Sequence, residues 1–378
     1  MKVLSKIIIM AAGLLVASCA QRDITVTTEV KSDGSCIRMV TFKSDSSVLV
    51  GATDSKERGA LLTLDNWEKY WSIKGETEKH SYPMSSSQYD SIARLLKNRG
   101  CKTTVADTVL LCATREFQSA EFVAASEPLK VDGKPLEAQS LLERKFRWFY
   151  TDYIYSETFE PLIGKFPLPL DDYLAPEAAS FWFTGSPDIM QGYTPSEFKD
   201  KLDAIQTAAE KWLNACMLSM SYDVVARNYQ KVKDAPVDYN SFIANHDAVI
   251  EFLNKNKELK VDKPLLLIDE FYNTDAYTNS LSSDSAVNAE IDGKFQLVID
   301  VSSLDARYRI VMPGTIVDAG NGTLTDNVAE YRVTGSRLLP NKYTISVTSR
   351  KVNVWAVTLT AVLFITAVVL WLRKKDNK

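Results

Sequence analysis

The stretch VWAVTLTAVLFITAVVLWL, from Val354 to Leu372, decides how the rest of the chain is arranged. Its nineteen residues contain no charge. A helix of that length is about 28 Å long, close to the hydrocarbon thickness of a bilayer. Trp355 and Trp371 lie near its two ends, where amphipathic rings favour the headgroup layer. The stretch therefore predicts a transmembrane helix rather than a helix buried in a globular core. Basic residues follow it at once, at Arg373, Lys374, Lys375 and Lys378.

The beginning of the chain has the layout of a secretory signal. Lys2 and Lys6 precede an apolar run from Ile7 to Ala17, and small residues follow. The segment Val16-Ala17-Ser18-Cys19 resembles a bacterial lipobox, in which the cysteine thiol receives a diacylglyceryl group. We expect cleavage before Cys19 and lipidation of Cys19. The alternative is an ordinary cleavage site followed by a coincidental cysteine.

These two segments predict a topology. A cysteine is acylated on the outer side of the cytoplasmic membrane, and the C-terminal helix would then stop transfer and leave its basic tail in the cytoplasm. Arg350 and Lys351 lie on the outer flank against four basic residues inside, a mild bias of the positive-inside kind. We therefore expect a bacterial inner-membrane protein whose ectodomain faces the periplasm or extracytoplasmic space.

The composition is that of a folded protein. The formal net charge is −4, with 46% hydrophobic and 24% charged residues, and no basic patch stands out. Nucleic acid is therefore not an expected partner. The segment between signal and helix exceeds the usual size of one domain, which allows one large domain or two.

Four cysteines remain besides Cys19: Cys36, Cys101, Cys112 and Cys216. An even number in an oxidising compartment permits disulfides, and three pairings are possible. Cys101 and Cys112 are close enough in sequence to face each other across a hairpin. The favoured interpretation is that these two are small buried apolar side chains.

Strand patterns dominate the first part of the chain. The run from Ile24 to Val30 and the run from Ile37 to Lys43 are rich in β-branched residues, and Asp33-Gly34 between them is a strong hairpin signal. The periodicity of Ser87 to Asn98 predicts a helix, and Thr108 to Phe117 reads as extended.

The aromatic stretch from Phe146 to Phe159 favours a strand over a helix. Both faces of such a strand carry aromatic side chains. One interpretation is an aromatic recognition surface. The favoured one is a central strand covered on both faces.

Helical patterns take over in the middle. Thr194-Pro195-Ser196-Glu197 reads as a capping box with proline at the first helical position, and apolar residues then recur at three- and four-residue steps to about Lys231. Asp238 caps a second helix, and a third is expected between Pro264 and Tyr277. We take residues 170–279 as a helical insertion.

Strand patterns return near the end. They are found at Phe295 to Val301, Tyr308 to Met312, Val328 to Val333 and Tyr343 to Thr348. The expected fold is α+β, an antiparallel sheet built from N- and C-terminal strands, with a helical insertion and one C-terminal transmembrane helix. The expected segments are a signal peptide (1–18), a strand-rich part (19–169), the helical insertion (170–279), a second strand-rich part (280–351), the transmembrane helix (352–372) and a basic tail (373–378).

Several of these features together resemble the LppM-type lipoprotein module. They are the lipobox, the hairpin at Asp33-Gly34, the sequence Val311-Met312-Pro313-Gly314 followed by Asn321-Gly322, and the terminal helix with its basic tail. The resemblance covers about a third of the chain, at its two ends, and the helical middle departs from it. It implies a bacterial envelope protein without established catalysis, and it assigns no functional residue.

The sequence contains few candidate catalytic or metal-binding residues. The only histidines, His80 and His246, are not in a metal-ligand spacing, and the common hydrolase and nucleotide-binding motifs are missing. Two carboxylate pairs, Asp171-Asp172 and Asp269-Glu270, are candidates for acid–base work on a glycan. Adjacent acidic residues more often mark a solvated surface. We therefore assign no catalytic, cofactor-binding or metal-binding residue.

The sequence leaves three functional hypotheses. The first is a membrane-tethered ectodomain that binds a protein, a lipid or a wall component without catalysis. The second is a hydrolase of envelope glycan or lipid that uses the acidic residues of the insertion. The third is a lipid-holding cavity between sheet and helices, lined by Phe146 to Tyr155.

Overall fold

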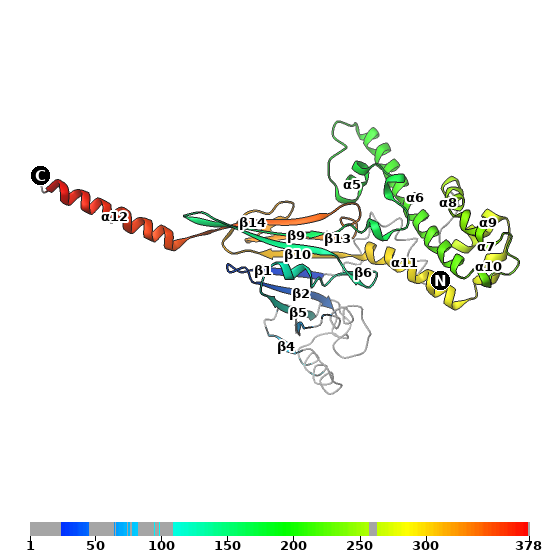
Figure 1. Cartoon of the computed structure of the whole chain (residues 1–378), viewed down its shortest axis with the longest axis horizontal. Helices are drawn as coiled ribbons and strands as arrows, with labels where there is room; N and C mark the ends of the chain where they lie inside the picture. Colours follow the sequence, from blue (N-terminus) through cyan, green and yellow to red (C-terminus); the bar gives the residue numbers. More distant parts are fainter. Residues whose placement is uncertain are drawn as a thin grey trace.

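The structure is a computed structural model that describes residues 24–44, 109–256 and 263–376, with short segments between residues 64 and 98. Two packed β-sheets form the body, a group of helices projects from one end, and a single long helix leaves the other (Figure 1). The expected signal peptide, Cys19, Cys101 and most of the expected helix from Ser87 to Asn98 lie outside the described residues.

The larger sheet joins strands from both parts of the chain, as the sequence predicts. Its order is β12 (Thr323–Thr325), β13 (Val328–Thr334), β10 (Asp305–Val311), β1 (Ile24–Val30), β2 (Cys36–Ser44), β5 (Val109–Phe117), β3 (Glu68–Ile73) and β4 (His80–Ser81). The predicted hairpin at Asp33-Gly34 is confirmed, since β1 pairs with β2 from Ile24↔Phe42 to Val30↔Cys36. The sheet is mixed, because β1 and β10 run parallel while its other pairs are antiparallel.

The smaller sheet packs on the larger one. Its order is β11 (Thr315–Asp318), β14 (Tyr343–Val352), β9 (Tyr150–Phe159) and β8 (Ala138–Phe146), all antiparallel. A short helix α4 (Glu121–Ala124) and a small ribbon of β6 (Lys130–Val131) and β7 (Lys134–Pro135) precede it in the chain.

Alternation of side chains explains the packing of the two sheets. In β9, Tyr153, Tyr155, Glu157 and Phe159 are buried at every second position, and the residues between them are partly exposed. Because successive side chains of a strand point to opposite faces, this strand faces the larger sheet with one side only. Phe159 meets Tyr308 of β10 edge to face, with ring centroids 5.5 Å apart.

The helical insertion lies between β9 and β10, and we call it the helical arm. Its helices are η2 (Ile163–Lys165), η3 (Leu170–Asp172), α5 (Pro176–Thr184), α6 (Pro195–Arg227), η4 (Tyr229–Lys231), α7 (Tyr239–Ala244), α8 (His246–Lys255), α9 (Pro264–Tyr272), α10 (Ala276–Leu281) and α11 (Ser285–Ser303). α6 leads out from the body, α11 packs against it and returns, and α7 to α10 lie around the far end (Figure 1).

The start of α6 confirms the predicted capping box. The hydroxyl of Thr194 accepts from the backbone N–H of Glu197, and the Glu197 carboxylate accepts from the backbone N–H of Thr194 at 2.9 Å. The helix runs for 33 residues, which corresponds to about 50 Å. This length carries the far end of the arm well away from the sheets.

Two sequence predictions about local structure are wrong. They are the strand at Phe295 to Val301 and the central strand, covered on both faces, at Phe146 to Phe159. Phe295 to Val301 is not a strand but the last part of α11, because Val287, Ile291, Phe295 and Val298 recur at helical spacing and are buried on one face. The helices of the arm therefore continue past Asn279 to Ser303.

The stretch from Phe146 to Phe159 is not one central strand. It contains the end of β8, a tight turn over residues 147–149, and then β9. β8 is an edge strand, and Phe146, Trp148 and Phe149 at the turn are exposed. The favoured interpretation, burial on both faces, is therefore wrong at this tip.

The last helix, α12 (Val354–Asp376), continues directly from β14 and leaves the body (Figure 1). Among the described residues it is the one helix long and apolar enough to cross a membrane, and only 6% of its most apolar window is buried inside the molecule. A core helix of a soluble protein would be mostly buried. The helix therefore has the length, composition and exposure of a membrane span.

Candidate functional site

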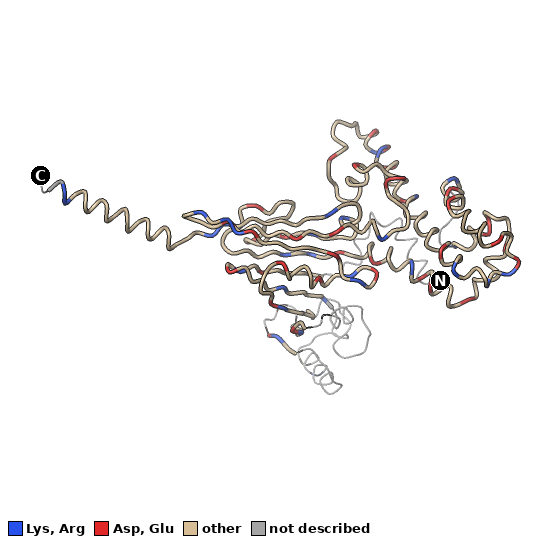
Figure 2. The backbone as a smooth tube through the Cα atoms, viewed as in Figure 1, with Lys and Arg blue, Asp and Glu red and all other residues tan. Residues whose placement is uncertain are grey.

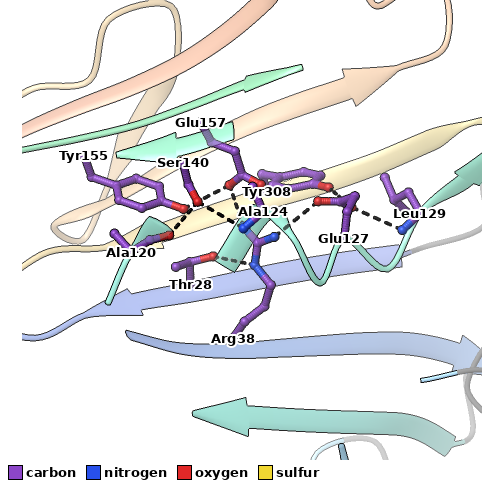
Figure 3. A network of polar contacts seen from close by, with 10 residues as sticks. All are labelled: Thr28, Arg38, Ala120, Ala124, Glu127, Leu129, Ser140, Tyr155, Glu157 and Tyr308. Atoms are coloured by element: carbon purple, nitrogen blue, oxygen red, sulfur yellow. Dashed lines mark hydrogen bonds and ion pairs between the residues drawn. The ribbon is translucent and has the colours of Figure 1, made fainter. Parts of the chain in front are cut away.

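The most distinctive polar feature of the body is a buried ionic cluster between the two sheets (Figure 3). Arg38 of β2 is completely buried, and so is Glu157 of β9. The Arg38 guanidinium donates from Nη2 to Glu157 Oε2 at 2.5 Å, from Nη1 to Glu127 Oε2 at 3.2 Å, and from Nε to the Thr28 hydroxyl at 3.1 Å. One arginine thus bridges the larger sheet, the smaller sheet and the segment after α4.

Two tyrosines complete the cluster. The Tyr308 hydroxyl donates to Glu127 Oε1 at 2.6 Å, and the Tyr155 hydroxyl donates to Glu157 Oε2 at 3.1 Å. The backbone N–H of Leu129 also donates to Glu127, at 3.2 Å. Burial raises the pKa of both tyrosines well above the usual value, so both keep the proton that they donate.

The charges of this cluster do not balance when both carboxyls are ionised. One guanidinium then faces two carboxylates, and Glu157 Oε1 is buried without a hydrogen-bond partner. Burial raises the pKa of Glu127 to about 7, against the opposing effect of Arg38 and with a further increase from Glu157. Glu127 therefore binds a proton near neutral pH.

Geometry argues that the cluster stabilises the fold and does not act on a substrate. The side chains of Arg38, Glu127 and Glu157 are each at most 1% exposed, so no substrate can reach them. Removing one partner of a buried ion pair is strongly destabilising, because the other charge is left buried and uncompensated. The cluster joins residues from β1, β2, β9 and β10, and it links the two sheets.

Protonation of Glu127 makes a measurable prediction. The folded-state pKa of about 7 lies above the ordinary value of 4.5, so the stabilisation is fully present below about pH 4.5 and is lost as the pH rises through about 7. The expected loss in the free energy of unfolding is about 3 kcal/mol across this window. Glu127→Gln should remove most of this pH dependence in denaturant titrations from pH 4.5 to 8.

The control for this prediction is Glu116→Gln on β5, whose side chain is 74% exposed. It should leave the pH dependence as it is in the parent protein. If Glu127→Gln and Glu116→Gln give the same slope of stability against pH, the proton is not held at Glu127.

A groove on the arm is a candidate binding site. It has a volume of about 620 Å³ and lies between η3, α6 and α8. Its lining includes Asp172, Tyr173, Asp203, Lys211 and Asn254. The amide of Asn254 donates to the Tyr173 hydroxyl at 3.3 Å, while its buried Oδ1 has no hydrogen-bond partner. Side chains of both charges with an aromatic ring and an amide suit a polar ligand.

The two members of each predicted carboxylate pair lie in different surroundings. Asp172 lines the groove described above, and Asp171 lines a second groove of about 450 Å³ beside Phe166. Asp269 is buried and accepts from the backbone N–H groups of Tyr277 and Thr278 at 3.0 and 2.9 Å. Asp269 therefore holds the first turn of α10, which explains its burial without a catalytic role.

The structure also brings together a serine, a histidine and an aspartate that sequence inspection did not connect. The hydroxyl of Ser219 lies 2.9 Å from His246 Nε2, and His246 Nδ1 lies 2.8 Å from Asp247 Oδ1. Ser219 is buried in the last third of α6, while the Asp247 side chain is 98% exposed. A nucleophilic serine has to be accessible and to face oxyanion donors. The contact is therefore a hydrogen bond that joins α6 to α8.

The described cysteines behave as buried apolar side chains, which confirms the favoured interpretation for Cys112. Cys36, Cys112 and Cys216 are free and buried. Cys112 therefore does not form the hairpin disulfide with Cys101. Burial raises the pKa of the Cys36 thiol to about 11 and that of Cys216 to about 12, so neither is a reactive thiolate near neutral pH.

Within the described part of the chain, no group of three or more His, Cys, Asp or Glu side chains has a geometry suited to a metal ion. No protein-family model, no curated protein and no solved structure matches the chain. The molecule is therefore classified by its own architecture. It is an α+β protein with two packed sheets, an inserted helical arm and one exposed apolar helix at its C-terminal end.

Sequence reasoning missed the buried cluster, although a signal for it is present. Arg38 lies two residues before Val40 and two after Cys36, and Glu157 alternates with Tyr155 and Phe159 in the same way. A charged residue in register with the inward apolar positions of a strand indicates a buried partner. The sequence does not say which partner, because the residues come from distant segments.

Proposed function

We propose that this protein is a bacterial envelope lipoprotein that holds a helical binding arm away from the membrane without catalysing a reaction. In this proposal a lipid on Cys19 and the helix α12 fasten the two ends to the cytoplasmic membrane. The body faces the periplasm or extracytoplasmic space, and the basic tail lies in the cytoplasm. The observation that carries the proposal is the position of α12, which leaves the body at the end opposite the arm (Figure 1).

Several features support this arrangement. The exposure of α12 favours a lipid environment over a protein core. A spanning helix holds a protein far more firmly than one acyl modification, so α12 would keep the protein at the inner membrane. The resemblance to the LppM-type lipoprotein module agrees with an envelope location. The charged and polar side chains that line the groove between α6 and α8 suit a polar ligand at a distance from the membrane.

A binding role accounts for the arm better than catalysis does. The two carboxylates of the groove, Asp172 and Asp203, accompany a lysine and an amide, a set suited to hydrogen bonding with a polar partner. The serine and histidine contact is buried at Ser219. Hydrolysis of envelope glycan or lipid remains the alternative, and its only structural support is the carboxylate content of the groove.

The topology is tested by two measurements on native membranes. Alkaline carbonate should leave the mature protein in the membrane pellet, because α12 spans the bilayer. A protease added outside spheroplasts should digest the body and spare a small fragment that contains α12 and the tail. Release by carbonate, or a body that resists external protease until the membrane is dissolved, would contradict the proposal.

A further inference from the structure

The tip of the β8–β9 hairpin lies against the first two turns of α12, although more than 200 residues separate them in sequence. The indole N–H of Trp148 donates to the Thr360 hydroxyl at 2.8 Å. The Trp355 ring stacks on Phe146, with centroids 6.4 Å apart, and meets Trp148 edge to face at 5.5 Å. Phe146, Trp148 and Phe149 are all about half exposed. We call these three residues the aromatic tip.

The position of Thr360 on the helix fixes the depth of the aromatic tip. Thr360 lies six residues after Val354, or about 9 Å along the helix. If the membrane began only below Thr360, the thirteen residues from Thr360 to Leu372 would span about 20 Å, too little for a hydrocarbon core of about 30 Å. A span that uses the whole apolar stretch therefore places the aromatic tip within the outer leaflet.

Four backbone groups of the tight turn over residues 147–149 have hydrogen-bond partners within the protein. The Asn353 side chain donates from Nδ2 to the carbonyl oxygens of Arg147 at 2.7 Å and of Trp148 at 3.3 Å, and its backbone N–H donates to Phe149 O at 2.9 Å. The Arg147 N–H donates to Tyr150 O at 2.8 Å. Water would satisfy these groups in an ordinary surface turn, whereas in lipid each has to be satisfied by the protein.

The charges around the tip complement a phospholipid surface. The segments 143–152 and 349–353 contain five basic and two acidic residues, a net charge of +3. Figure 2 shows basic residues gathered where the body meets α12. Tryptophan and phenylalanine beside lysine and arginine match the boundary between acyl chains and phosphates in a leaflet.

We propose that the aromatic tip is a second membrane-inserted element, seated at the boundary of headgroups and acyl chains in the leaflet that α12 enters first. This inference rests on the proposed membrane span. Without the tip, only α12 and the proposed lipid on Cys19 would attach the body to the bilayer. With the tip inserted beside the helix, the body has a further contact with the bilayer, and the arm is held at a fixed height above it.

The experiment measures the depth of single fluorescent labels in the full-length protein. An environment-sensitive dye is attached at Phe149→Cys, at Tyr239→Cys on the far end of the arm, or at Leu363→Cys in the middle of α12, in each case with Cys101→Ser. Cys36, Cys112 and Cys216 are buried, and the parent without an added cysteine corrects for background labelling. Each protein is reconstituted into vesicles of phosphatidylethanolamine and phosphatidylglycerol. Quenching by aqueous iodide is then compared with quenching by nitroxide-labelled lipid.

The expected result is that the label at residue 149 is quenched by lipid nitroxide and is several-fold less accessible to iodide than the label at residue 239. The label at residue 363 should be quenched by lipid nitroxide alone. A water-accessible label at 149 together with a lipid-embedded label at 363 would overturn the inserted tip and leave the span intact. A water-accessible label at 363 would overturn the span and the inserted tip with it.

Discussion

Arg38→Met is expected to lower the free energy of unfolding by about 3 to 5 kcal/mol, because it leaves buried carboxyl groups without their cation. Arg38 touches Glu127 and Glu157, both of which are buried. Methionine fills much of the volume of the arginine stem but donates no hydrogen bond. Urea denaturation of the protein in detergent micelles, followed by near-UV circular dichroism, measures the loss.

A matched control is Arg332→Met in the same sheet. Arg332 of β13 pairs with Asp305 at 2.6 Å, but its side chain is 56% exposed. Exposed ion pairs contribute less than about 1 kcal/mol to the free energy of unfolding. The stability of Arg332→Met should therefore remain close to that of the parent protein. Equal losses for Arg38→Met and Arg332→Met would show that the buried cluster has no special role.

A rescue experiment separates charge from packing. When Arg38→Met is combined with Glu127→Gln and Glu157→Gln, the two tyrosines keep acceptors and no unpaired charge remains. Most of the lost stability should return, since the main cost of the single change is the uncompensated carboxylate. A triple variant as unstable as Arg38→Met would attribute the loss to packing instead.

Gly314→Ala is expected to be strongly destabilising. Gly314 has φ +84°, and a Cβ atom there would lie 2.3 Å from the carbonyl oxygen of Arg350. The left-handed backbone costs a residue with a side chain about 1 to 2 kcal/mol, and forced displacement of a neighbouring backbone adds about 1 to 3 kcal/mol. The free energy of unfolding should therefore fall by about 2 to 5 kcal/mol.

Gly133→Ala isolates the steric part of this prediction. Gly133, in the turn between β6 and β7, has φ +71°, but nothing lies within 4 Å of its ideal Cβ position. The free energy of unfolding of Gly133→Ala should fall only by the cost of the left-handed backbone, about 1 to 2 kcal/mol. If the two variants unfold at the same urea concentration, the close approach of Gly314 to β14 does not constrain the fold.

The contact at Gly314 also explains a sequence motif. Pro313-Gly314 marks a turn in the sequence, and the structure shows why glycine is required there. The chain enters β11 directly beside the end of β14, at the pair Thr315↔Arg350. Only a residue without a side chain allows the two backbones to approach so closely.

Local features were predictable wherever the signal lies within one segment. The β1–β2 hairpin, the capping box at Thr194 and the apolar helix from Val354 are each specified by neighbouring residues. Errors arose where a local pattern was ambiguous. The β-branched run from Phe295 to Val301 fits a strand as well as a helix, and packing against α6 decides for the helix.

The sequence alone determined the exposed apolar helix, the α+β class and the helical insertion, because periodicity, caps and apolar length act over a few turns of chain. Only the tertiary structure decided the parallel pairing of β1 with β10, the Arg38 cluster and the contact of Trp148 with Thr360. Each of these joins segments that lie far apart in the sequence. Such contacts depend on how distant segments pack together, which local helix and strand propensities do not determine.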